Sequence, residues 1–206
     1  MVISRFPAIE ECVNAFAKLP GIGPKSAQRI VFHLLSKDTD LSKLISSSCD
    51  SLIAKISLCP RCSMLVQSET DADSCRNCFI KDPPQICIVE NHSDVFAIQR
   101  TGNFRGSFHV LMGLISALDR TEPEDLTISL LIERIKSLGT KEVILALNPN
   151  MAGEGTSLYL SKILKPLGVK ISKLARGIPM GSQLEYADEI TLSRYCLLYT
   201  SPSPRD

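Results

Sequence analysis

Cys59-Pro-Arg-Cys62 and Cys75-Arg-Asn-Cys78 are two Cys-x-x-Cys pairs, and twelve residues separate them. Each pair places two thiolates on one side of a tight turn, and two facing turns form a cage of four sulfur ligands. Zn²⁺ suits this cage because it accepts tetrahedral coordination and binds soft thiolates well. The cysteines therefore predict a small zinc module over residues 57–80.

Other interpretations of the cysteines explain less of the pattern. A redox dithiol needs only one Cys-x-x-Cys pair, and four unrelated cysteines would rarely fall into two equal spacings. A four-thiolate site leaves no coordination position open, which favours one structural Zn²⁺ per chain over a catalytic metal. Cys12, Cys49 and Cys87 lie in apolar patterns, and we expect them to be small core residues.

The composition is that of a globular protein of one or two small domains. The 206 residues are 44% hydrophobic and 22% charged, and the net charge of +1 gives no global basic field. No signal peptide and no apolar run long enough to cross a membrane is apparent, and the cysteine pattern needs reduced thiols. We therefore expect a cytoplasmic location without membrane contact.

Two patterns of hydrophobic residues divide the chain. Residues 8–56 carry three apolar stripes with helical spacing. After the prolines of Lys81-Asp-Pro-Pro84, which indicate a linker, short apolar runs alternate with helical patterns, as in a mainly parallel sheet of the α/β class. The expected strands are 86–89 and 143–147, with weaker candidates at 171–174 and 189–192, and the expected helices are 93–100, 126–138 and 155–166.

A glycine-rich hairpin, Leu19-Pro-Gly-Ile-Gly-Pro-Lys25, joins the first two expected helices. Gly21 and Gly23 leave the backbone uncovered, and the N–H groups at the start of the next helix can bind a phosphate. Lys25 and Arg29 are four residues apart and share one helical face. The hairpin therefore predicts a phosphate contact without base specificity, and the alternative is a plain helical hairpin with a solvated basic face.

Polar residues follow the two strongest predicted strands. Glu90 follows the first strand, and Asn148-Pro-Asn150 and Glu154 follow the second. Three carboxylates at these strand ends would hold Mg²⁺ for phosphoryl chemistry, but Asn148 and Asn150 are neutral. The sequence therefore predicts the remnant of an acidic site with at most weak Mg²⁺ binding. The alternative is that Asn148-Pro-Asn150 only ends the strand.

In this order, the hairpin, the four cysteines and Glu90 with Asn148-Pro-Asn150 resemble the RecR family of bacterial recombination mediators. The segment Arg176-Gly-Ile-Pro-Met-Gly-Ser-Gln-Leu-Glu-Tyr-Ala-Asp-Glu-Ile-Thr-Leu192 is similar to the Walker-B-like stretch of that family. The resemblance implies a helix-hairpin-helix region over residues 1–56, a Cys₄ zinc finger over 57–80 and a Rossmann-like Toprim domain over 81–194.

The resemblance also implies a function without catalysis. Family members act with RecO and RecF to load RecA onto single-stranded DNA coated by single-strand-binding protein. The family's DNA-binding residues fall on Lys25 and Arg29, beside Gly21 and Gly23. It further implies binding to double-stranded DNA and to single-strand/double-strand junctions, a dimer or tetrameric ring, and a nucleoid-associated location. The alternative function is an active Mg²⁺-dependent Toprim nuclease or topoisomerase.

The chain departs from the family pattern at two places. Ala152 stands where the Asn-Pro-x-x-Glu-Gly pattern usually has Glu, which weakens any RecO contact by that residue. Residues 195–206 show no periodicity and resemble translated sequencing-adapter sequence, so we expect them to be a non-native tail.

Overall fold

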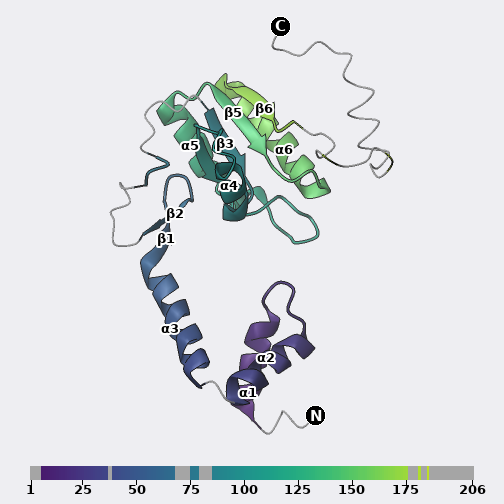
Figure 1. Ribbon diagram of the computed structural model, residues 1–206. Coiled ribbons are helices and arrows are strands. Elements are labelled where there is room, and N and C mark those ends of the chain that lie inside the picture. Colours follow the sequence, from purple (N-terminus) through teal and green to yellow (C-terminus); the bar gives the residue numbers. More distant parts are fainter. Residues whose placement is uncertain are drawn as a thin grey trace. The chain divides into compact units, whose positions relative to one another are not determined.

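The computed structural model describes residues 6–36, 39–67, 75–78 and 85–175, together with Gly181 and Glu185 (Figure 1). The chain forms two compact units, Met1–Ser57 with Gln67–Glu69 and Leu58–Val66 with Thr70–Asp206. The second unit therefore contains both the four cysteines and the larger sheet.

Several predicted features lie outside the described residues. These are the linker 81–84, the weak strand 189–192, the tail 195–206 and all of the Walker-B-like stretch except Gly181 and Glu185.

Three helices form the first unit, as the three apolar stripes predict: α1 (Pro7–Ala17), α2 (Pro24–Ser36) and α3 (Thr39–Lys55). α1 and α2 each begin with a proline, at a position where the helix needs no backbone donor. α1 packs against α2, which buries Ala27 and Val31. The apolar stripe of α3 is largely exposed, with Leu52 64% and Ile53 77% accessible.

The second unit contains a four-stranded sheet in the order β4-β3-β5-β6, and all three pairings are parallel. The predicted strands 86–89, 143–147 and 171–174 correspond to three of its members. The four strands are β3 (Gln85–Val89), β4 (Ser107–Val110), β5 (Glu142–Ala146) and β6 (Lys170–Lys173).

Helices follow the strands, as the predicted alternation requires. They are α4 (His92–Gln99), α5 (Ile128–Leu138) and α6 (Met151–Leu164), with short 3₁₀ turns η3 (Pro123–Asp125) and η4 (Lys165–Leu167). The central strand β3 is buried on both faces. Ile86 and Ile88 pack in one core cluster with Leu131 of α5 and Leu160 of α6, whereas Cys87 and Val89 belong to a second cluster with Val95 of α4.

Strand β4 was not predicted because its sequence, Ser-Phe-His-Val, interrupts the apolar run with polar residues. All four residues are nevertheless buried. His109 is accommodated because its Nε2 lies 3.0 Å from the backbone oxygen of Thr127, and burial lowers its pKa to about 4. A neutral imidazole can therefore take a core position that the sequence pattern assigns to an apolar residue.

The prediction for the remaining cysteines is confirmed for Cys87 only. Cys87 is buried in the sheet, Cys12 is half-buried on α1, and Cys49 is exposed on α3. The prediction was wrong for Cys49 because α3 packs only weakly in this chain, so an apolar position on this helix need not be a core position.

Candidate functional site

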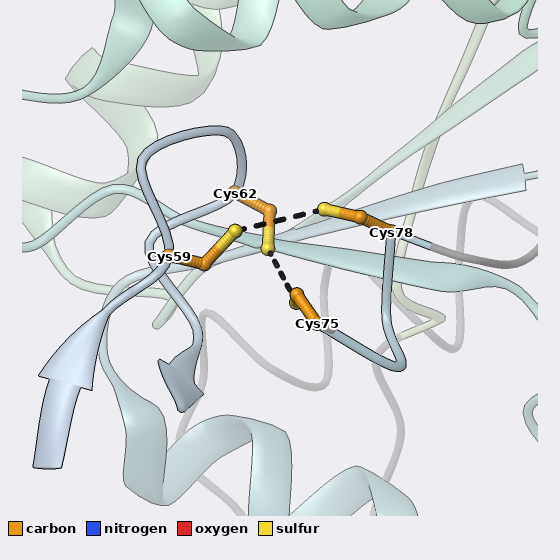
Figure 2. Close-up of side chains that lie close together, drawn as sticks. All are labelled: Cys59, Cys62, Cys75 and Cys78. Atoms are coloured by element: carbon orange, nitrogen blue, oxygen red, sulfur yellow. Dashed lines mark hydrogen bonds between the residues drawn. The ribbon is translucent and has the colours of Figure 1, made fainter. Parts of the chain in front are cut away.

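The four predicted cysteine ligands converge on one point. Their Sγ atoms all lie within 4.8 Å of one another (Figure 2). The Sγ atoms of Cys59 and Cys78 are 3.8 Å apart, and those of Cys62 and Cys75 are 3.6 Å apart. Four sulfurs at a tetrahedral Zn²⁺ ion lie about 3.8 Å from one another, so this donor set fits a metal ion.

Local turns place each pair of sulfurs. The N–H of Ser63 donates to the Cys59 carbonyl at 2.9 Å, and Ser63 adopts a positive φ of 57°. The N–H of Cys78 donates to the Cys75 carbonyl at 2.8 Å, which closes the second turn. The first turn lies between strands β1 (Ile56–Leu58) and β2 (Leu65–Gln67), which pair with each other.

One of the four cysteines, Cys62, has a lower pKa than an ordinary thiol. A hydrogen bond from Cys78 lowers the pKa of Cys62 to about 5 and raises the pKa of Cys78. Burial raises the pKa of Cys75 to about 11. Because a metal displaces thiol protons, we expect metal binding to release protons and to strengthen as the pH rises.

The cysteine module covers the outer edge of strand β4. The N–H of Val110 donates to the Cys62 carbonyl at 3.1 Å. The Asn77 amide donates to the Phe108 carbonyl at 2.8 Å and accepts from the Phe108 N–H at 2.6 Å. These contacts satisfy backbone groups that an edge strand would otherwise leave unpaired, and they join the module to the sheet.

The predicted phosphate-binding residues lie on the hairpin between α1 and α2. Gly21 has a φ of +79°, and the N–H of Ala27 donates to the Gly23 carbonyl at 2.9 Å as α2 begins. Lys25 and Arg29 are both exposed on α2. The hairpin thus presents two cations beside a helix N-terminus, where first-turn N–H groups lack partners within the helix.

The predicted acidic remnant is only partly brought together. The Asn148 amide donates to Glu90 Oε2 at 2.9 Å, which joins the ends of β3 and β5. Asn150 instead caps α6, because its Oδ1 accepts from the Gly153 N–H at 2.8 Å. Glu154 forms an ion pair with Lys173 at 3.2 Å. Within the described ranges, the cysteine centre is the only cluster of three or more His, Cys, Asp or Glu side chains close enough to hold a metal.

Two contributors to these sites were missed by sequence reasoning. Lys173 ends β6 and forms an ion pair with Glu154 in the first turn of α6. A lone lysine in the sequence gives no signal for such a pairing. Gly153 is required because a Cβ there would lie 2.0 Å from the Asn148 carbonyl oxygen. The Asn-x-x-Gly spacing could have indicated this cap.

No described helix is both long enough and apolar enough to span a membrane.

A helical hairpin, a four-cysteine centre and a parallel sheet with Glu90 at its carboxyl edge define a helix-hairpin-helix protein with a Toprim domain. Residues 84–175 match the Toprim domain family, 9–48 the RecR helix-hairpin-helix family and 177–194 the RecR C-terminal family.

Close relatives cover nearly the whole chain. A recombination protein RecR from Bifidobacterium longum subsp. infantis is 43% identical over 94% of this chain and 96% of its own length. Proteins of the same name from Streptomyces coelicolor and Chlorobium limicola are 42% and 43% identical, over 90% and 91% of this chain and 92% and 93% of their own lengths. The chain belongs to the RecR family.

Proposed function

We propose that this protein is a DNA-binding mediator of recombinational DNA repair. In this function it acts with RecO and RecF to help load RecA onto single-stranded DNA that single-strand-binding protein covers. The observation that carries the proposal is the hairpin, where Lys25 and Arg29 are exposed next to an uncovered backbone turn. Its ligand is the phosphate backbone of double-stranded DNA and of single-strand/double-strand junctions.

Gly23 supports a ligand at the hairpin. A Cβ at this position would meet no atom within 4 Å, and the residue does not adopt a positive φ. The fold of the hairpin therefore does not itself require glycine there. Close approach of a phosphate to the backbone N–H groups would require it, because a side chain would stand between them.

Replacing Gly23 with alanine should separate binding from folding. We expect the thermal stability of Gly23→Ala to stay close to that of the unmodified protein, because the added methyl group meets open space. We expect its affinity for duplex DNA to fall by about tenfold at 0.1 M salt, the value of one lost phosphate contact. Fluorescence anisotropy with labelled duplex DNA measures this change.

Gly155→Ala is the matched control, since a Cβ there also meets open space, on α6. Equal DNA affinity of the Gly23 and Gly155 variants would contradict a backbone phosphate contact at the hairpin.

The Toprim domain is proposed to be a non-catalytic scaffold. Glu90 accepts a hydrogen bond from the Asn148 amide, and Glu154 forms an ion pair with Lys173. A metal-dependent enzyme would need these carboxylates as ligands for its cation. The Asn150 side chain caps α6 by accepting a hydrogen bond from the Gly153 N–H. We propose that Glu90, Asn148, Asn150 and Glu154 instead form part of a surface for RecO.

Incubation with Mg²⁺ tests the alternative function. We expect supercoiled and nicked plasmid DNA to remain uncut by the protein at millimolar Mg²⁺, because the carboxylates needed to hold the ion are replaced or paired. Agarose gel electrophoresis reads the outcome. Cleavage that Glu90→Gln abolishes, and that the exposed-site control Glu133→Gln retains, would establish a Toprim nuclease or topoisomerase instead.

The cysteine centre is proposed to hold one structural Zn²⁺ per chain through Cys59, Cys62, Cys75 and Cys78. Three of the four side chains are buried, and the set leaves no open ligand position for a substrate. Zn²⁺ would therefore stabilise the module and its attachment to β4 without taking part in a reaction.

Assembly into a dimer or tetrameric ring is supported by the exposed apolar stripe on α3. Leu44, Ile45, Leu52 and Ile53 are all exposed, and Ile45 and Leu52 share one helical face. Such a stripe is typical of a helix that packs against another protein chain. A ring would also bring several hairpins to one DNA molecule, which compensates for the small charge of each.

We infer a cytoplasmic, nucleoid-associated location.

A further inference from the structure

Arg134 of α5 is a buried charged residue that the proposed function has not used. Its side chain lies in the core of the second unit, with 5% of its surface accessible. Its guanidinium donates to the Phe108 carbonyl at 2.6 Å and to the Asn77 carbonyl at 3.4 Å. Phe108 belongs to β4, and Asn77 lies between the two cysteines of the second turn.

The charge of Arg134 needs a compensating negative charge. A guanidinium stays protonated at any ordinary pH, and burying it without a counter-charge is costly. The two acceptors above are neutral carbonyls, and among the described residues no carboxylate forms an ion pair with Arg134. His109 cannot supply this charge, because an imidazole is either neutral or positively charged.

The cysteine centre supplies negative charge close to Arg134. Four thiolates around a divalent ion carry a net charge of −2, which is spread over the sulfurs. Arg134 reaches the second cysteine turn through the Asn77 carbonyl, and Asn77 directly precedes Cys78 in the chain. The guanidinium therefore lies in a buried environment beside the turn that supplies two of the four ligands, where its charge can stabilise a metal–thiolate centre.

We propose that Arg134 is a positioning residue for the metal centre, which balances the negative charge of the metal-loaded cysteines and fastens the second cysteine turn to strand β4. This inference rests on the proposed metal site. It makes metal loading and sheet packing depend on each other, because the same guanidinium contacts the Phe108 carbonyl of the sheet and the Asn77 carbonyl of the module.

Metal release from the full-length protein tests the proposal. Protein loaded with Zn²⁺ is mixed with excess chelator, and a zinc-sensitive dye reports the release rate. We expect Arg134→Met to weaken zinc retention about 10- to 100-fold, as is usual when a partner of the metal ligands is lost. Lys136→Met removes an exposed charge from the same helix and should release zinc at the unmodified rate.

A second measurement separates charge compensation from simple packing. The loss of melting temperature caused by Arg134→Met should be larger in the zinc-loaded protein than in the metal-free protein, because the loaded centre carries more of the negative charge that Arg134 balances. A residue that merely fills space would lower both melting temperatures equally. If the methionine variant does not fold, Arg134→Lys and Arg134→Gln are compared instead. We expect the lysine variant to retain zinc better, because it keeps the positive charge.

The outcomes distinguish this inference from the metal site itself. If the unmodified protein binds no zinc, both the metal site and the inference fail. If it binds zinc, and Arg134→Met releases the metal at the unmodified rate or Arg134→Gln retains it as well as Arg134→Lys, only the inference fails.

Discussion

Cys62→Ser is expected to lose the metal and to destabilise the second unit by about 4 kcal/mol, in the range typical of a lost metal site. Cys62 is fully buried, its sulfur lies 3.6 Å from Cys75, and its carbonyl accepts from the Val110 N–H of β4. Serine is a poor ligand for Zn²⁺, so three thiolates would remain around a weakly held ion. Thermal unfolding with zinc analysis measures both effects.

The control for this prediction is Cys49→Ser. Cys49 is exposed on α3, so the same substitution there should change neither zinc content nor melting temperature. A stable, zinc-free Cys62→Ser protein would contradict the structural role of the metal. If such a protein also failed to bind DNA, the cysteine centre itself would have to belong to the DNA-binding surface.

Lys25→Ala combined with Arg29→Ala is expected to weaken DNA binding by about 10- to 100-fold at 0.1 M salt, because two phosphate contacts are lost. Both side chains are exposed and one helical turn apart on α2, so their removal should leave the fold unchanged. In an assembled ring the loss recurs in each subunit and multiplies. Anisotropy with duplex and junction DNA measures affinity, and circular dichroism checks the fold.

Lys43→Ala provides a matched loss of charge. Lys43 is exposed on α3, which is not one of the two helices that the hairpin joins. We expect it to alter affinity only slightly. Equal weakening by Lys43→Ala and by the double variant would show that general positive charge, and not the hairpin, attracts the DNA.

The sequence was informative where one local pattern determines the structure. The continuous apolar run of Ile86 to Val89 can be buried only on both faces of a sheet, and this is its position in β3. The paired spacing of the cysteines likewise required two facing turns, and their sulfurs meet. In both cases, residues close together in the chain carry enough information to specify the geometry.

The sequence was less informative where distant residues decide. Nothing local indicates that Lys173 would pair with Glu154 or that Arg134 would reach Asn77, because these contacts depend on how separate elements pack. Strand β4 was missed for the same reason, since His109 is acceptable in the core only through its contact with Thr127. The sequence shows that Asn148 and Asn150 carry no charge. It did not indicate that the Asn150 side chain caps α6.

Salt dependence of DNA binding tests the central claim most directly. The affinity of the unmodified protein and of the Lys25→Ala/Arg29→Ala variant for one duplex is measured over a range of salt concentrations. Each phosphate contact contributes about one unit to the slope of log affinity against log salt. We predict a steep slope for the unmodified protein and a slope about two units shallower for each pair of hairpin residues removed. Equal slopes for the two proteins would contradict the assignment of the hairpin as the phosphate-binding site.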